Sequence, residues 1–431
     1  MKSFLSRSFA VLFVVLLSIS SLVIFNVKAQ ARTIVVPDDY PTIQEAITAS
    51  TDGDSIFIKE GRYDGPQKQT LVINKSISLI GENTKNTVFT LYPDWDYNHF
   101  PNYPENYFYD TGIIVRANDV EISSLTILTK TVPSNSETLV SGGDVVTIGN
   151  KTQITNCVVY SGFAILEGSN HIITGNTIDY FLLESGSFCL ISNNKISTAL
   201  RVMGDAVSNE IFGNLITGSS TGLLVRGSNN LVFNNTITGC DRGISVFGEL
   251  DECYNNIFYF NELSNNTLGI DMMARGDNLV FFANYIANND CGVAVRRDYS
   301  PADGVFYGNS FVDNIVQVNT DLMYVFGDGR KEIAYHAGLF DNGTFGNYWS
   351  DYGGIDVNGD GIGDSPYVID ENRTDHYPLM DPYTTTEITI PSFPSPTIEP
   401  DHFPTTIVLT SVVIIAVVGL GIFAFFKKRR S

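Results

Sequence analysis

A short motif, an asparagine followed two positions later by an apolar side chain, recurs through the middle of this chain. Successive copies lie 18 to 26 residues apart. Four copies are followed eight residues later by a glycine–aliphatic pair, and four are preceded by another asparagine six residues earlier. The motif asparagines are Asn176, Asn194, Asn214, Asn235, Asn261, Asn284 and Asn309; the pairs are Gly222-Leu223, Gly243-Ile244, Gly269-Ile270 and Gly292-Val293; the preceding asparagines are Asn170, Asn229, Asn255 and Asn278.

This repeat predicts stacked coils. Apolar residues within each copy alternate with a period of two, which is typical of short strands with one buried face. Glycine and asparagine, which tolerate a positive φ, separate these strands. A coil of about twenty residues cannot bury its own apolar face and must stack on similar coils. Equivalent asparagines would then align into side-chain amide ladders. A leucine-rich horseshoe is excluded because its Leu-x-x-Leu-x-Leu pattern is absent.

A solenoid needs a cap, because its open end exposes strand edges and core. Thr42 and Glu45 form a capping-box pair that predicts a short helix with one apolar face. We therefore expect an N-terminal cap and first strand over residues 32–66. The β-helix itself is expected over residues 67–345 and a C-terminal cap over residues 346–383.

Both ends of the chain carry apolar segments. The first follows Lys2 and Arg7 and ends in a small-x-small site, which indicates a cleavable signal peptide; an uncleaved anchor is the alternative. The second is uncharged over about one bilayer thickness and precedes four basic residues, which predicts one membrane span with the preceding chain outside the cell. A Ser/Thr/Pro-rich stretch before it predicts a stalk. The segments are signal peptide 1–31, stalk 384–406, transmembrane helix 407–426 and basic cytoplasmic tail 427–431.

Two stretches carry a resemblance to known families. The opening TIVVPDDYPTIQEAI from Thr33 resembles the start of pectin-lyase-fold proteins. The closing GNYWSDY from Gly346 and DVNGDGIGDSPY from Asp356 resemble NosD-type proteins. The resemblance implies an all-β, right-handed parallel β-helix that is secreted or surface-bound. It implies carbohydrate binding or, as in the founding members of the NosD family, help in loading copper into nitrous oxide reductase.

The closing stretch also predicts a calcium loop. Carboxylate and amide oxygens at every second position, with glycines that permit a sharp turn, can surround a hard cation such as Ca²⁺. The expected structural calcium site comprises Asp356, Asn358, Asp360, the Ile362 carbonyl and Asp364. The position where an EF-hand has its bidentate glutamate holds Tyr367. The alternative is an Asx-rich turn without metal.

Two features suggest carbohydrate binding. An aromatic-rich insertion between Tyr92 and Tyr109 interrupts the repeat, and its rings could stack on sugar faces or form a small core of their own. Three arginines each stand four residues after a glycine of a Gly–aliphatic pair, so coil stacking could align them on one outer face, where they would meet an acidic glycan or only solvent. The predicted carbohydrate-binding residues are Trp95, Tyr97, Tyr107, Arg116, Arg226 and Arg296.

Other residue classes give weaker signals. The acidic balance, 26 basic against 47 acidic residues, argues against nucleic acid as a partner. Five cysteines without a C-x-x-C are expected to fill the interior, with a disulfide between two of them as the alternative. The five histidines lack ligand spacing for copper. Six glycosylation sequons begin at Asn74, Asn150, Asn234, Asn265, Asn342 and Asn372, and chance explains most of them in so asparagine-rich a chain.

No catalytic motif known from polysaccharide hydrolases of this fold occurs in the repeat region, and Asp205 and Asp271 are isolated outward candidates. The sequence therefore predicts a membrane-anchored surface β-helix protein without catalysis that binds glycans or serves in the cell envelope. The alternatives are a polysaccharide lyase or hydrolase and a NosD-like accessory in copper delivery.

Overall fold

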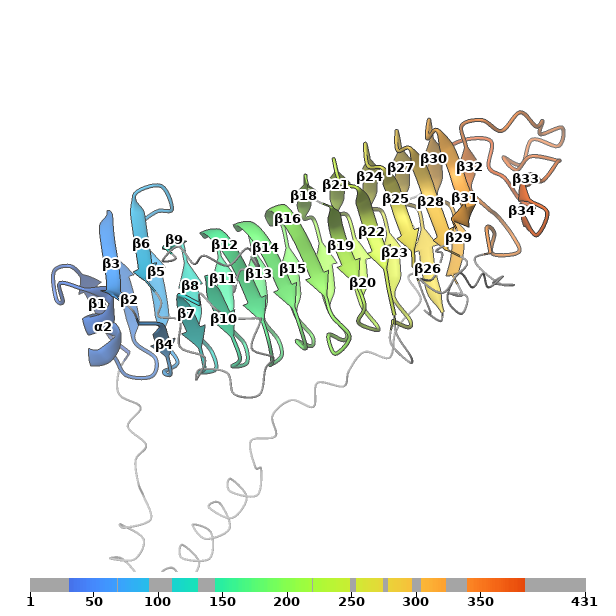
Figure 1. Ribbon diagram of the computed structural model, residues 1–431. Helices are drawn as coiled ribbons and strands as arrows, with labels where there is room; N and C mark the ends of the chain where they lie inside the picture. Colours follow the sequence, from blue (N-terminus) through green and yellow to red (C-terminus); the bar gives the residue numbers. More distant parts are fainter. Residues whose placement is uncertain are drawn as a thin grey trace, which may run out of the picture. The chain divides into compact units, whose positions relative to one another are not determined.

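The computed structural model describes residues 31–67, 69–92, 111–130, 144–218, 220–248, 253–273, 278–296, 304–322 and 339–383. Over these residues the chain winds into stacked coils of three short strands each (Figure 1). Strands of successive coils pair in parallel, and only a hairpin near residue 370 is antiparallel. The fold is a parallel β-helix, as the repeat predicted.

Three stacks of strands form the walls of the β-helix. The first sheet contains β1 (Thr33–Val36), β2 (Ser55–Ile58), β5 (Ser78–Gly81), β8 (Glu121–Ser123), β11 (Gln153–Thr155), β13 (Ile172–Thr174), β15 (Leu190–Ser192), β17 (Glu210–Phe212), β20 (Leu231–Phe233), β23 (Ile257–Tyr259), β26 (Leu279–Phe282) and β29 (Gly304–Tyr307). The second sheet contains β3 (Gly61–Gln67), β6 (Thr87–Tyr92), β9 (Thr126–Thr129), β12 (Val158–Ile165), β14 (Thr177–Leu183), β16 (Lys195–Val202), β18 (Leu215–Thr217), β21 (Thr236–Thr238), β24 (Glu262–Ser264), β27 (Tyr285–Ala287), β30 (Ser310–Val312) and β32 (Tyr348–Trp349). The third sheet contains β4 (Leu71–Ile73), β7 (Ile113–Val115), β10 (Val145–Thr147), the second halves of β12, β14 and β16, and β19 (Thr221–Val225), β22 (Arg242–Val246), β25 (Leu268–Met272), β28 (Cys291–Arg296) and β31 (Val316–Leu322).

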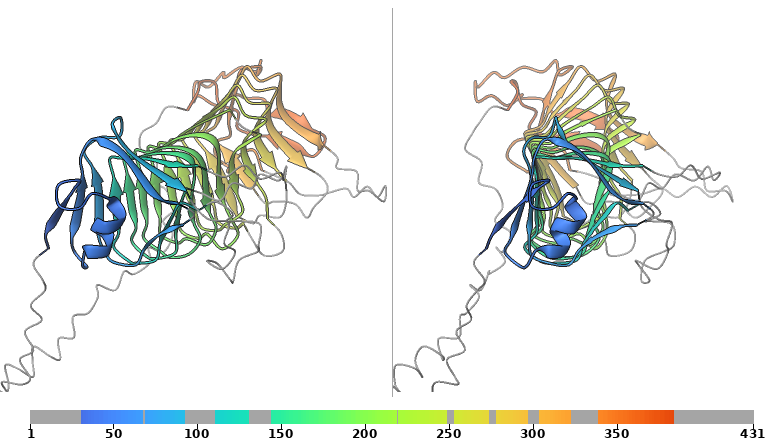
Figure 2. Two further views of the ribbon diagram at one scale, coloured as in Figure 1. Left: turned by 60° about the vertical axis from the view of Figure 1, so that its left-hand side comes forward. Right: turned by 90° about the vertical axis from the view of Figure 1, so that its left-hand side faces the viewer.

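Helix α2 (Ile43–Ala49) lies at the N-terminal end, in front of the coils when they are viewed along their axis (Figure 2). Thr42 precedes it, and its Oγ1 accepts a hydrogen bond from the Glu45 backbone N at 3.1 Å. The Lys75 Nζ donates to three carbonyls at the other end of α2, at 2.8–2.9 Å, where a positive charge complements the helix dipole. The first sheet already begins with β1 and β2, so residues 32–66 contribute two of its strands.

The core fills the inside of the coils. One inward position of the first sheet changes in register from isoleucine (Ile173) in β13 to phenylalanine in β23, β26 and β29. Rings of Phe258, Phe281 and Phe306 stack with centroids 4.5 Å apart. All five cysteines are buried and free, as expected of interior filling. A hairpin of β33 (Tyr367–Asp370) and β34 (Arg373–Asp375) follows the last coil.

Amide ladders join the coils at their turns. The longest runs through every predicted motif asparagine from Asn176 to Asn309 and ends at Asn347. In each rung the backbone N and the Nδ2 of one asparagine lie 2.9–3.1 Å from the Oδ1 of the next. Each Nδ2 also donates to a backbone carbonyl of an earlier coil. This buried contact confirms the ladder prediction.

Backbone conformation and steric contacts explain why the other asparagines and the glycines of the repeat recur. The asparagines six positions before the motif have φ between 56° and 60°, the left-handed region that asparagine tolerates. The glycines of the Gly–aliphatic pairs stand in one column. A Cβ at Gly243 would lie 2.5 Å from the Gly269 carbonyl oxygen of the next coil, and one at Gly269 would lie 2.6 Å from that of Gly292. Only glycine permits this approach.

The ladder can be tested with two neighbouring residues. Asn235→Ala should lower the free energy of unfolding by roughly 2–4 kcal/mol, because it leaves several buried donors and acceptors unpaired. Asn234→Gly is the matched control: Asn234 is exposed and has a φ of 52°, which glycine also adopts, so the expected change is below about 0.5 kcal/mol. Urea unfolding followed by circular dichroism measures both. Equal losses in the two variants would contradict the ladder's role.

Candidate functional site: the outer face of the third sheet

Strand register defines a central outward column on the third sheet. Its residues alternate with core residues such as Leu223 and Val225, and so they project away from the interior. The column runs Val72, Ile114, Val146, Ala164, Leu182, Arg201, Leu224, Ser245, Asp271, Ala294, Asn319. Its first part is apolar, and its second part carries charged and polar groups.

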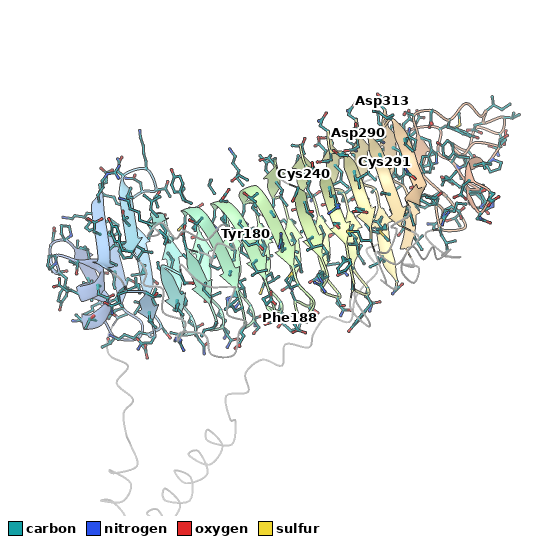
Figure 3. The ribbon with its side chains drawn as sticks, in the orientation of Figure 1. Tyr180, Phe188, Cys240, Asp290, Cys291 and Asp313 are labelled. Atoms are coloured by element: carbon teal, nitrogen blue, oxygen red, sulfur yellow. The ribbon has the colours of Figure 1, made fainter. Side chains whose placement is uncertain are left out.

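The apolar part forms a separate cluster outside the main core. Val146, Ala164 and Leu182 join Leu166 there, all 6% exposed or less. Tyr180 and Met203 pack against this cluster. Figure 3 labels Tyr180 near the middle of the β-helix, with Phe188 at its lower edge and Asp290 and Asp313 along its upper edge. The polar part of the column therefore begins beside an apolar surface.

Arginine is concentrated on this face. Within the described residues between 111 and 322, every arginine belongs to a third-sheet strand or directly follows one. The lysines of the same stretch, Lys130, Lys151 and Lys195, lie elsewhere on the coils. The arginines are Arg116, Arg201, Arg226, Arg242 and Arg296. In a chain of net charge −21, this face is thus the place where the described arginines of the coils gather.

The predicted arginine column exists but is interrupted. Arg116 follows β7 and Arg226 follows β19, and pairing places five coil steps between them, about 24 Å at strand spacing. Leu166 occupies the same column position in between, as the sequence indicated, and so does Glu184. Arg296 ends β28, and its side chain lies outside the described residues. The arginines of this column therefore do not form a continuous row, because other side chains stand between them.

Two of the arginines stack on aromatic rings. The Arg226 guanidinium carbon lies 5.0 Å from the centroid of the Phe247 ring, and that of Arg201 lies 5.5 Å from the Tyr180 ring. Cation–π contacts of this kind hold a guanidinium in place against the ring face.

Glu184 brings a titratable group to the same place. Burial raises its pKa, the charge of Asp205 raises it further, and Arg226 lowers it. Its Oε2 is buried and has no hydrogen-bond partner within the described part of the chain. Glu184 therefore keeps its proton to a higher pH than an exposed glutamate does.

Asp271 plays a different part from the one expected of an isolated outward acid. It is fully buried, and its Oδ2 accepts from the Arg242 Nε at 2.9 Å. Ser245, its neighbour on the preceding coil, is 1% exposed, and its Oγ finds no partner in the described residues. Burial of an acid requires such a paired cation, so the Arg242–Asp271 pair is a fixed part of this face.

The predicted aromatic insertion falls outside the described residues. Trp95, Tyr97 and Tyr107 all lie between residues 93 and 110, so their role stays a prediction. Only Tyr92 at its start is described: its hydroxyl lies 3.1 Å from Asp64 Oδ1, and the Lys130 Nζ lies 5.7 Å from its ring.

The predicted calcium loop folds as a series of Asx turns. The Asp356 carboxylate accepts from the backbone N of Gly359, Asp360 and Gly361 at 2.7–3.3 Å. These bonds, the one from Gly361 first, lower the pKa of Asp356. Asp360 Oδ1 accepts from the Ile362 backbone N, and Asp364 Oδ2 from Val357.

The donor set of this loop is hard oxygen, which suits Ca²⁺. In the described ranges, no group of three or more His, Cys, Asp or Glu side chains gathers that could hold a metal ion by itself. Its hydrogen bonds are those of Asx turns, and calcium binding stays a prediction.

The parallel coils, amide ladders and outer charged face together define the class of this protein as a parallel β-helix. A family model described as "Right handed beta helix region" matches residues 180–319. No curated protein sequence matches the chain.

Several solved structures resemble this one. They include the A-module of Azotobacter vinelandii mannuronan C-5 epimerase AlgE6 (13% identity, 70% of this chain and 92% of that chain covered, TM-score 0.46) and an alginate lyase from Paenibacillus sp. str. FPU-7 (13%, 68% and 99%, 0.43). The catalytic domain of a GH87 α-1,3-glucanase in complex with nigerose is another (12%, 73% and 69%, 0.49). These names describe an epimerase, a lyase and a glucanase. At these TM-scores they carry no argument about the activity of this chain.

Sequence reasoning missed Glu184, Arg201 and Arg242. Glu184 shares the column of Arg226, and this could have been found by extending that column to coils without a glycine pair. Arg201 and Arg242 lie in other columns of the same sheet, and only the full strand register relates them to Arg226.

Proposed function

We propose that this protein is an exported, membrane-anchored β-helix whose third-sheet face binds an acidic polysaccharide. The observation that carries this proposal is the concentration of arginine on one face of an acidic protein. Guanidinium groups bind carboxylates with paired, charge-assisted hydrogen bonds. Apolar groups such as Tyr180 beside Arg201 provide the flat area that sugar rings contact.

Export and anchoring rest on the sequence. The signal peptide at 1–31, the stalk at 384–406 and the span at 407–426 lie outside the described residues, apart from residue 31. Among the residues that are described, no helix has the length and apolarity needed to cross a membrane. An arrangement with one C-terminal anchor would present the β-helix to extracellular polymers.

A second candidate function, a polysaccharide lyase or hydrolase, is favoured by Glu184. Such an enzyme needs a group that transfers a proton beside the sugar chain. The raised pKa of Glu184 and the effects of the Asp205 and Arg226 charges on it describe a group of that type. The third alternative, NosD-like copper delivery, has only the sequence resemblance in its favour.

A matched pair in one strand tests the binding face. Arg201 and Lys195 are both exposed residues of β16, but Arg201 belongs to its third-sheet half and Lys195 to its second-sheet half. Arg201→Ala should weaken binding of alginate or polygalacturonate about tenfold, since a charge-assisted hydrogen bond contributes about 1.5 kcal/mol. Lys195→Ala, which removes the same charge, should change the affinity less than about twofold. Isothermal titration measures both, and an equal loss in the two variants would argue for general electrostatics instead of a site.

Glu184→Gln tests the enzyme alternative. If Glu184 acts as general acid, turnover of a polysaccharide should fall at least about 100-fold in the variant. In the wild type turnover should decline as pH rises through the raised pKa of Glu184, because the protonated form is then lost. Glu210→Gln, an exposed acid on the first sheet, should retain full activity. Release of reducing ends and of unsaturated products measures hydrolysis and lysis. Unchanged turnover in Glu184→Gln would remove this residue from the mechanism.

The calcium loop is tested by chelation. If the loop at Asp356 binds Ca²⁺ with the metal about 100-fold above its Kd, EDTA should remove about 3 kcal/mol of stability and lower the Tm by a few degrees. Asp360→Ala should abolish this sensitivity to EDTA, whereas Asp290→Ala, on an exposed turn between the second and third sheets, should retain it. Differential scanning calorimetry measures the shift. A wild-type Tm indifferent to EDTA would contradict calcium binding.

A further inference from the structure

The six sequons differ sharply from the ladder asparagines in exposure. Every sequon asparagine is exposed, whereas the ladder asparagines are buried. The repeat itself enforces this division, because the residue two positions after a motif asparagine is apolar and fills the core, so it cannot be the Ser or Thr of a sequon. Exposure alone therefore leaves all six as candidates for modification.

Asn342, four residues before the C-terminal cap, has a geometry that the other sequons lack. Its Oδ1 accepts hydrogen bonds from the Thr344 Oγ1 at 2.6 Å, the Thr344 N at 3.0 Å and the Phe345 N at 3.0 Å. The sequon is thus folded as an Asx turn around the hydroxyl that defines it. Because Oδ1 is fixed toward the turn, the acceptor nitrogen Nδ2 is directed away from it.

The surroundings of this sequon are open. Asn342, Gly343 and Thr344 are all exposed. Gly343 has a φ of +83°, and no atom outside its chain neighbours lies within 4 Å of a Cβ built there. An enzyme that must enclose these three residues would meet no neighbouring coil at Gly343.

Three other sequons are tied to the coils. In Asn234-Asn235-Thr236 and Asn265-Asn266-Thr267 the middle residue is a buried ladder asparagine, which bonds to the coils on either side. In the third, the Asn150 Nδ2 lies 3.2 Å from Asn118 Oδ1, and Asn150 Oδ1 accepts from the Ser169 N. These segments cannot enter an enzyme's groove without breaking contacts between coils.

We propose that Asn342 of the folded protein is an acceptor of an N-linked oligosaccharide. The donor would be an oligosaccharide on a lipid diphosphate, and the enzyme an oligosaccharyltransferase outside the cytoplasm. The new bond joins the sugar C1 to Asn342 Nδ2, the bond between C1 and the diphosphate oxygen breaks, and the Nδ2 proton leaves with the lipid diphosphate. The proposal depends on the predicted export of the chain but not on polysaccharide binding.

The test uses the full chain, purified in detergent from cells that lack N-glycosylation. The folded protein is incubated with an oligosaccharyltransferase and a lipid-diphosphate oligosaccharide, and peptide occupancy is read by mass spectrometry. Occupancy at Asn342 should exceed that at Asn234 and Asn265 at least fivefold. Thr344→Val should abolish modification of Asn342, and Thr344→Ser should restore it.

Protein unfolded in urea and then returned to the reaction without refolding provides the control for sequence preference. In that sample the occupancies of the three sites should become similar. An unmodified Asn342 in the folded protein would overturn the proposal, and so would a preference for Asn342 that persists unchanged in the unfolded chain. A peptide containing Asn342 that carries no sugar, in protein taken from the cells that naturally make it, would overturn it equally.

Discussion

The buried side-chain amide of asparagine is the interaction on which this β-helix depends. At each turn the chain must reverse direction while its backbone groups lie out of reach of water, and an unpaired buried group costs about 1–3 kcal/mol. A ladder asparagine meets this need with one side chain, since its Oδ1 accepts from the preceding coil and its Nδ2 donates onward and to a backbone carbonyl. Among the described residues, three such buried ladders run through the stack. Their first asparagines, Asn176, Asn209 and Asn266, each accept from the backbone N of a cysteine one coil earlier.

The two ends of the long ladder are closed by residues that are not asparagines of the repeat. Cys157 stands one rung before Asn176, and its thiol points to the Ile122 carbonyl as the amide of Asn176 points to that of Ile154. The cysteine side chain is small and apolar, and its thiol is a weak hydrogen-bond donor. It is therefore suited to the end of a ladder, where no further side-chain amide follows. At the other end Asn347 donates to the buried Asp375, which also accepts from the Trp349 indole. Burial raises the pKa of Asp375, and its three hydrogen-bond donors oppose that rise. The C-terminal cap thus completes the long ladder.

The sequence revealed the parts of the structure that repeat. The motif asparagines, the left-handed asparagines and the glycine pairs all occur at fixed offsets, because each solves the same steric or hydrogen-bonding problem in every coil. The outer face could be predicted only in part, since its residues are free to change from coil to coil. The sequence assigned Arg116 and Arg226 correctly to one column. It could not give the number of coil steps between them, which is five, because loops of unequal length change the number of residues in a coil. The burial of Asp271 against Arg242 and the position of Glu184 likewise require the register of every strand.

The repeated positions hold the coils together, whereas the variable outward positions are free to carry residues of a binding site. Register holds an outward residue within about 5 Å of its counterparts on neighbouring coils, whatever its type, so single substitutions can build a site without disturbing the ladders. Arg201 and Lys195 illustrate the point: one strand, β16, presents one charge to each of two faces, and only the third-sheet charge has an aromatic partner and further arginines near it. The ladders fix where a side chain stands, and the outward positions that vary from coil to coil are the ones that give the third-sheet face its arginines.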